Sequence, residues 1–338
     1  MAARTLVVIL GETRAHELTF ALFKQNVLDT LQADLALCVG TTTSTAPDPF
    51  RAAAKYTWEY PEPSDWTGAF DAYGEGRDWR GLLAVRDQWL GGVKHPTLQQ
   101  GGSGGVLLVF REFLRRQAVE SGVLDQYDWL VVTRSDMMWP TPHVPPALLS
   151  PDHIYFPDAE RYRGYTDRHV IVPRKHFASF LAIPQPVFAE PEALLGRMQK
   201  LDREDWNIET FLKFRLDEMG LTSAIRFFPY FMYAVRMGDG ATRGATGNYS
   251  AEHRFFIKYR SEYAIAQIVQ TLVRSPGDWK YLLGRRRFVS WRMWVYCLLR
   301  AEAEKPGMVG GLVFPRLVKR FFVTLLQPID PSRLDRLR

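Results

Sequence analysis

The stretch most informative for chemistry runs from Tyr127 to Asp136, where an apolar strand is followed by Arg134, Ser135 and Asp136. Open α/β sheets bind ligands at the carboxyl ends of their strands, so these polar side chains are expected in a ligand crevice. The guanidinium group of Arg134 is a forked donor that suits phosphate oxygens. The alternative is structural, because an aspartate at a strand end also caps the following turn.

A second concentration of charge covers residues 158–169, between two short apolar runs. This segment contains Gly164, which permits close approach of the backbone, together with Arg163, Asp167 and Arg168. The pattern fits a loop that contacts a ligand. A solvated surface loop is the alternative, because a cluster of charge is by itself a weak indication of a site.

Acidic residues recur at the predicted start of a helix, where Glu209 is the main candidate for chemistry and Asp205 is the reserve. The alternative is that the helix macrodipole alone favours acids in a first turn. Two less specific features complete the set. One is the loop from Gly11 to Arg14 after the first strand, and the other is His253, a histidine of the ordinary surface or core kind unless it binds a metal.

In their order along residues 5–255, these features resemble the GT-A class of nucleotide-sugar glycosyltransferases. The resemblance implies a nucleotide-sugar donor and a glycan or lipid-linked acceptor. It assigns Glu209 and Asp167 to catalysis, Glu209 as general base if the anomeric centre inverts and Asp167 in contact with sugar hydroxyls. The residues that it assigns to the donor are Gly11, Arg14, Arg134, Ser135, Asp136, Gly164 and Arg168.

The resemblance also implies a divalent cation, Mn²⁺ or Mg²⁺, because that class holds the donor diphosphate through a metal bound at a strand-end Asp-x-Asp sequence. Here Arg134 replaces the first aspartate and only Asp136 remains. Two alternatives therefore stay open. Either Asp136 holds the metal, with His253 as a candidate second ligand, or Arg134 supplies the positive charge directly.

The expected strands and helices that position these residues alternate along the chain, which predicts an α/β fold. The expected form of this fold is a GT-A-like Rossmann-type mixed sheet flanked by helices. Residues 41–81 are expected to form a long irregular segment over the surface. The predicted division is a catalytic domain at 1–262 and a basic helical extension at 263–338. The expected strands are Leu6–Leu10, Asp34–Val39, Tyr127–Thr133, His153–Phe156 and His169–Val172, and Ala224–Met237 is expected to form a strand or a pair of strands. The expected helices are His16–Thr30, Val106–Ser121 and Asp205–Gly220.

The composition excludes several classes of protein. The hydrophobic fraction of 46% and the charged fraction of 24% are ordinary for a globular chain, so global disorder is excluded. The two cysteines are far apart in the sequence, which disfavours a disulfide framework or a cysteine zinc site and favours a reducing cytoplasm. The sequence contains no P-loop, and no Gly-x-Gly-x-x-Gly follows the first strand. The stretch Gly102-Ser103-Gly104 is not a Gly-x-Ser-x-Gly elbow, because no strand is expected before it.

The net charge of +6 is concentrated at the carboxyl end of the chain. Residues 274–338 contain 14 Lys and Arg against 5 Asp and Glu, whereas residues 1–273 contain 29 against 32. Clustered arginines alternate there with aromatic and apolar residues, as in helices that lie in an anionic membrane interface. We expect a cytoplasmic protein that is peripheral on the inner face of the membrane. A helical cap on the catalytic domain and an interface for another chain are the alternatives.

The sequence therefore favours a glycosyltransferase of surface polysaccharide synthesis. Two other functions stay open, a non-catalytic scaffold of the same fold docked on the membrane, and a nucleotidyl- or phosphotransferase on a related sheet. Nucleic acid is not an expected partner, because no recognised binding module accompanies the basic segment.

Overall fold

The computed structural model describes residues 3–41, 46–85, 88–93, 102–158, 161–201, 203, 205–238 and 246–284. Its centre is a seven-stranded sheet in the order β3-β2-β1-β4-β7-β6-β8, and a second sheet has the order β10-β11-β9-β5. The strands are β1 Thr5–Gly11, β2 Asp34–Gly40, β3 Tyr56–Tyr60, β4 Trp129–Thr133, β5 Met137–Met138, β6 Ile154–Asp158, β7 Val170–Pro173, β8 Ile225–Pro229, β9 Tyr233–Arg236, β10 Asn248–Ser250 and β11 Phe255–Ile257.

The larger sheet is mixed. Strands β1, β2, β3 and β4 run parallel, β7 is antiparallel to its neighbours β4 and β6, and β8 is parallel to β6. Buried apolar runs such as Leu6–Leu10 form these strands because both faces of the sheet are covered. The prediction of an α/β fold with a mixed sheet flanked by helices is confirmed.

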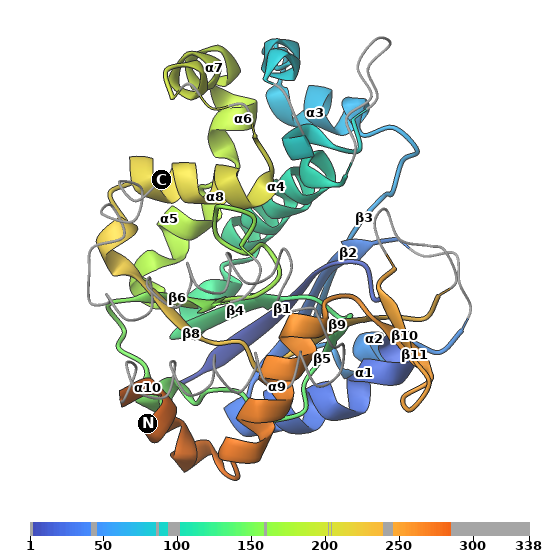
Figure 1. Ribbon diagram of the computed structural model, residues 1–338. Helices are drawn as coiled ribbons and strands as arrows, with labels where there is room; N and C mark the ends of the chain where they lie inside the picture. Colours follow the sequence, from blue (N-terminus) through green and yellow to red (C-terminus); the bar gives the residue numbers. More distant parts are fainter. Residues whose placement is uncertain are drawn as a thin grey trace, which may run out of the picture.

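Helices cover both faces of the sheet (Figure 1), with α3 to α8 on one side and α1 and α9 with the second sheet on the other. The alternation of side chains along β1 divides the core accordingly. Leu6 and Val8 pack on the α4 side, and Val7 and Ile9 pack on the α1 side. The helices are α1 His16–Phe23, α2 Pro49–Ala53, α3 Thr67–Gly74, α4 Gly104–Ser121, α5 Phe177–Leu181, α6 Gln185–Ala189, α7 Pro191–Gln199, α8 Ile208–Glu218, α9 Arg260–Leu272 and α10 Trp279–Gly284.

The segment from 41 to 81 differs from its prediction. Within its described part it forms α2, the edge strand β3 and α3 instead of an irregular surface excursion. Its aromatic residues explain the difference, because Phe50, Trp66, Phe70 and Trp79 are almost completely buried in the core. Burial of a large aromatic side chain stabilises a fold strongly enough to order a segment rich in Pro, Gly and Asp.

The predicted boundary between residues 262 and 263 falls inside α9. Ile265, Ile268 and Val269 of this helix lie in the same hydrophobic core as β4 and α1. Trp279 of α10 is fully buried and donates its indole N–H to the carbonyl of Pro142 at 3.1 Å. Residues up to Gly284 therefore belong to the folded body, and the rest of the predicted basic extension lies outside the described residues.

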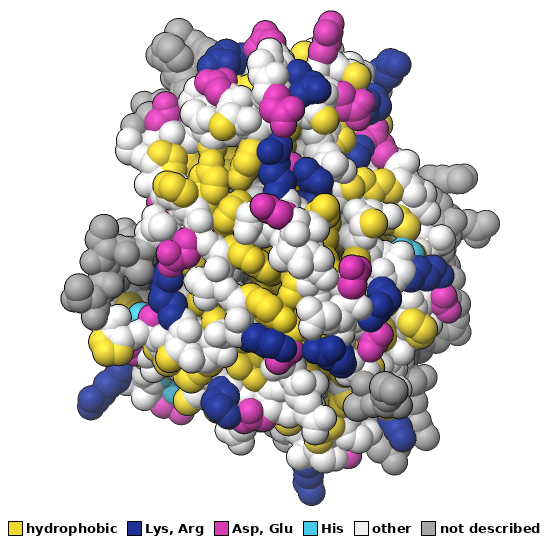
Figure 2. All heavy atoms as spheres, turned by 180° about the vertical axis from the view of Figure 1, so that it is seen from behind, with side chains coloured by type: hydrophobic (Ala, Val, Ile, Leu, Met, Phe, Trp, Pro, Cys, Tyr) yellow, Lys and Arg dark blue, Asp and Glu magenta, His cyan; other side chains and the backbone are white. Residues whose placement is uncertain are grey.

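The surface seen from behind carries Lys and Arg together with Asp and Glu around a central band of hydrophobic side chains (Figure 2). Large hydrophobic residues with high exposure occur at separate points of the described chain, among them Val119, Leu201 and Tyr249. No helix in the described ranges is long and apolar enough to cross a membrane.

Candidate functional site

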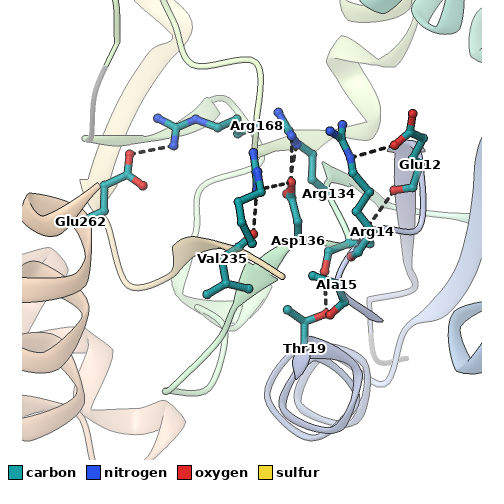
Figure 3. Close-up of polar contacts among 11 residues, drawn as sticks. Glu12, Arg14, Ala15, Thr19, Arg134, Asp136, Arg168, Val235 and Glu262 are labelled. Carbon is teal, nitrogen blue, oxygen red and sulfur yellow. Dashed lines mark hydrogen bonds and ion pairs between the residues drawn. The ribbon is translucent and has the colours of Figure 1, made fainter. Parts of the chain in front are cut away.

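The carboxyl ends of β1 and β4 are tied together by Ser135. Its hydroxyl donates to the carbonyl of Glu12 at 2.7 Å, with the carbonyl of Arg14 at 3.1 Å. Its own carbonyl accepts from the hydroxyl of Thr19 in α1 at 2.7 Å (Figure 3). Gly11 allows the sharp exit from β1, because its φ of 109° is unfavourable for other residues. Two predicted donor-binding segments are thus held in a fixed geometry.

Asp136 accepts from two arginines. Arg134 approaches with Nη2 2.9 Å from Oδ2 and Nε 3.2 Å from Oδ1, and Nη1 of Arg236 lies 2.6 Å from Oδ2. The aspartate is 1% exposed, and burial alone would raise the pKa of its carboxyl group. The guanidinium groups of Arg134 and Arg236 outweigh burial and hold that pKa well below its usual range.

Arg236 is a site residue that the sequence analysis missed. It belongs to β9, which pairs with β5 directly after Asp136, and the N–H of Val235 donates to the backbone carbonyl of Asp136 at 2.9 Å. The pairing of two strands a hundred residues apart decides this contact. The sequence did carry one signal, because an arginine directly after the apolar residues 233–235 and before Met237 needs a partner for its charge if it is buried.

Arg168 is held by a buried carboxylate from α9. Its Nη1 lies 2.7 Å from Oε1 of Glu262, and its guanidinium group stacks over Tyr259 at 4.9 Å and Tyr230 at 5.7 Å. In Figure 3 the side chains of Arg168, Arg134 and Arg14 lie in a row, with Glu262 near one end. The predicted loop residue Arg168 therefore does reach the strand ends that carry Arg134.

Lys258 adds a further positive charge to this edge of the sheet. It follows β11, and burial together with the guanidinium groups of Arg134, Arg236 and Arg168 lowers its pKa to about 8. The negative charge of Asp167 acts against this shift and raises the pKa of Lys258. We call Arg14, Arg134, Arg168, Arg236 and Lys258 the basic cluster.

Beside the basic cluster lie two carboxylic acids. Asp167 is half-buried, and its backbone carbonyl accepts from Nη2 of the buried Arg111 in α4 at 3.3 Å. Glu209 is in the first turn of α8 and is 8% exposed. Burial, reinforced by the charge of Asp167, raises the pKa of Glu209 to about 8, although Arg168 and Lys258 oppose this shift. At pH 7 the Glu209 carboxyl is therefore mostly protonated.

The backbone fixes Glu209 against the charged loop. Asn207 caps α8, its side chain accepting from the N–H of Thr210 at 2.8 Å while the Thr210 hydroxyl accepts from the N–H of Asn207 at 2.9 Å. The N–H of Tyr165 donates to the carbonyl of Glu209 at 3.0 Å. A Cβ atom at Gly164 would overlap that same carbonyl, so this glycine allows a close approach to the backbone of α8.

Two further predicted residues have partners outside the basic cluster. The Nε2 atom of His253, in the turn between β10 and β11, is 3.0 Å from the hydroxyl of Tyr263, and its ring stacks on Phe255. Asp205 forms an ion pair with Arg163 and is not held beside Glu209 by any hydrogen bond of the described residues. The reserve role of Asp205 stays a prediction.

A divalent cation does not fit the residues present. Both oxygens of Asp136 already accept from guanidinium groups, and within the described ranges no three His, Cys, Asp or Glu side chains come together as a metal site. The metal role of Asp136 and His253 stays an untested prediction. The chemistry of the donor set, five basic side chains at one sheet edge, suits an anion instead.

The comparisons with known proteins are sparse. No protein-family model and no curated protein matches the chain. Among solved structures, the crystal structure of mouse xyloside xylosyltransferase 1 in its apo form is 11% identical, with a TM-score of 0.33. The match covers 66% of this chain and 84% of that one. A likeness this distant assigns neither activity nor substrate, so both are argued from the site.

Proposed function

We propose that the protein is a glycosyltransferase that moves a sugar from a nucleotide-sugar donor to an acceptor hydroxyl. The observation that carries the proposal is the convergence of Arg14, Arg134 and Arg168 at the carboxyl edge of a mixed α/β sheet, beside the acids Asp167 and Glu209. Open α/β sheets bind nucleotides at this edge. Transfer of a sugar from a diphosphate requires a positive charge to stabilise the departing diphosphate and a nearby carboxylate to accept the proton of the acceptor hydroxyl.

In this reaction the bond between the anomeric carbon and the diphosphate oxygen breaks, and the acceptor oxygen bonds to the same carbon. Negative charge grows on the departing diphosphate, where Arg134 and its neighbours stabilise it. Asp136 positions Arg134 because it fixes the guanidinium group through two hydrogen bonds. This role replaces direct metal binding by Asp136 as the function that we propose for it.

Asp167 and Glu209 supply the acidic half of the site. The charge of Asp167 acts on the acids and on the basic cluster, since it raises the pKa of Glu209 and also favours the charged form of Arg134. We assign Asp167 to the sugar hydroxyls. Glu209 takes the acceptor proton once it is ionised, which its pKa of about 8 permits in a substantial fraction of molecules above neutral pH.

The finer assignments rest on the sequence. A lipid-linked or glycan acceptor and contact with an anionic membrane are proposed from the basic and aromatic composition of residues 274–338. A nucleotidyl- or phosphotransferase would use the same basic cluster but would leave the acids without a sugar to bind. A non-catalytic scaffold would not explain why Glu209 is buried beside Asp167.

The test is incubation of the full chain with single nucleotide sugars, with EDTA or with Mn²⁺, followed by product analysis. The proposal expects a nucleoside diphosphate and free or transferred sugar. Pyrophosphate or a nucleoside monophosphate as the product would reject it in favour of the nucleotidyl- or phosphotransferase. The Arg134→Ala variant should lose roughly 100-fold or more in rate. Arg174→Ala is the matched control, because Arg174 is exposed and pairs with Asp128 on the surface.

A further inference from the structure

The basic cluster contains one member without a carboxylate partner among the described residues. Its arginines each have one, since Arg134 and Arg236 pair with Asp136, Arg168 pairs with Glu262 and Arg14 pairs with Glu12. Lys258 contacts the ring of Tyr259, with Nζ 5.0 Å from the ring centroid. A cation in this setting is unfavourable, because three guanidinium groups repel its charge and burial removes part of its hydration.

The backbone of Lys258 is fixed in place. Its N–H donates to the carbonyl of Ala234 in β9 at 2.9 Å, two residues before Arg236. On its other side Tyr259 directly precedes α9, which carries Glu262 in its first turn. The chain is packed so closely here that a Cβ atom at Gly247 would overlap the backbone of Ile257 and come within 2.6 Å of the Lys258 Cα.

The half-buried Lys258 thus lies in the short connection between β11, which pairs with the strand that supplies Arg236, and the helix that supplies Glu262. Asp167 is the acid whose charge favours the ionised lysine, but it also acts on Arg134 and Arg168. One shared carboxylate leaves the cluster with an excess of positive charge. An anionic ligand removes this excess, and a group with two or more negative charges does so most effectively.

We propose that Lys258 binds a phosphate oxygen of a nucleoside diphosphate, which is held between Lys258 and Arg134 without a divalent cation. This inference rests on the proposed function, because it identifies how the donor is held at the same site. Lys258 acts as a compact point charge, whereas Arg134 supplies a planar fork.

The proposal has a signature in pH. Free Lys258 has a pKa of about 8, and a bound phosphate raises it, so binding takes up a proton when the lysine starts neutral. Affinity is then greatest below pH 8 and falls about tenfold per pH unit as the pH rises above the pKa of the free lysine. The groups that face Lys258 are Arg134, Arg168, Arg236, Asp167, Glu209 and Tyr259. Glu209 ionises over the same range, so the pH dependence is also measured in Glu209→Gln, where only Lys258 titrates near pH 8. The arginines stay charged over this range.

The experiment measures binding of UDP, GDP and pyrophosphate to the full chain by calorimetry in EDTA, from pH 7 to pH 10. The variants are Lys258→Ala, Lys258→Arg and the control Lys175→Ala, whose lysine is exposed and pairs with Asp152. We expect Lys258→Ala to weaken binding by about 10- to 100-fold without lowering the melting temperature of the ligand-free protein. Lys258→Arg should bind well and lose the fall above pH 8, and Lys175→Ala should match the wild type.

Two results separate this inference from the proposed function. If Lys258→Ala binds nucleoside diphosphate as tightly as the wild type, or if binding appears only with Mn²⁺, the role of Lys258 is wrong while sugar transfer can still be observed. If the wild type binds neither nucleotide nor pyrophosphate and hydrolyses no nucleotide sugar, both proposals are wrong.

Discussion

The Nη1 atom of Arg168 lies 2.7 Å from Oε1 of Glu262, and the two side chains are only 3% and 1% exposed. This ion pair joins the segment before β7 to the first turn of α9. A buried charge without its partner costs several kcal/mol, so each residue requires the other. The pair makes α9 part of the site, although the sequence pattern had assigned most of that helix to a separate extension.

Glu262→Ala should lower the free energy of unfolding by about 3–5 kcal/mol, because it leaves the Arg168 guanidinium buried without its carboxylate. Urea denaturation followed by circular dichroism measures the change. Arg168→Met combined with Glu262→Leu should recover much of the loss. Asp128→Ala, which removes the partner of the exposed Arg174, should stay close to the wild type. An equally small effect of Glu262→Ala would contradict the buried pair.

Gly164→Ala should be destabilising and should also weaken donor binding. Its Cβ would overlap the carbonyl of Glu209, and backbone at this helix start cannot move without disturbing the cap of α8. We expect a loss of about 1–3 kcal/mol in urea denaturation. Gly196→Ala is the matched control, because no atom lies near its Cβ position in α7. There alanine should stabilise by about 0.5–1 kcal/mol.

Acid should destabilise the fold through His143 and His169, whose ring centroids are 5.3 Å apart in the core. Burial lowers the pKa of His143 to about 4 and that of His169 well below its usual range. Depressed folded-state pKa values mean that the stabilisation is complete above about pH 6.5. It is lost as the pH falls, by up to about 1.4 kcal/mol per pH unit for each histidine.

Urea denaturation of the wild type and His143→Phe at pH 7 and pH 5 measures this contribution. The comparison between variants is needed because Glu209, with its raised pKa, changes stability in the opposite direction over the same range. The variant should lose less stability than the wild type between the two pH values. An equal loss in both proteins would mean that His143 is not neutral and buried in solution.

The rate of sugar transfer at saturating donor should rise with pH through about 8, because only ionised Glu209 accepts the acceptor proton. Glu209→Gln should lower kcat by about 100- to 10,000-fold and remove the rising limb of the profile. The measurement uses a saturating concentration of donor because Lys258 affects the affinity for the donor. Under this condition the rise of kcat with pH reports on Glu209 alone. A wild-type kcat that is constant from pH 6 to pH 9 would exclude Glu209 as the base.

Binding to anionic vesicles should depend on Arg285, Arg286 and Arg287. Each basic residue near such a surface contributes about 1 kcal/mol, so replacing all three with Gln in the full chain should weaken binding roughly 100-fold. Co-sedimentation with phosphatidylserine vesicles measures this, with phosphatidylcholine vesicles as the control. Substitution is preferable to truncation at residue 274, which would remove the core residues Trp279 and Leu282. Equal sedimentation of variant and wild type would remove the support for membrane contact.

Local patterns in the sequence were enough to predict the main strands and much of the site. The apolar runs at β1, β2 and β4 are buried on both faces, and such runs are recognisable from sequence because every residue is apolar. Asp136, Arg134 and Arg168 were found because each adjoins such a run. The ordered part of residues 41–81 was missed, because its helices and edge strand are short and are held by isolated buried aromatic residues.

What the sequence determined by itself is the α/β class of the fold and the polar residues that end its central strands, since both follow from short-range periodicity. Tertiary structure alone decided the partners of those residues. Arg236, Lys258 and Glu262 reach the site only because β9, β11 and α9 fold back beside β5 and the strand ends. Asp136 therefore anchors Arg236 as well as its sequence neighbour Arg134, and no local pattern encodes the contact with Arg236.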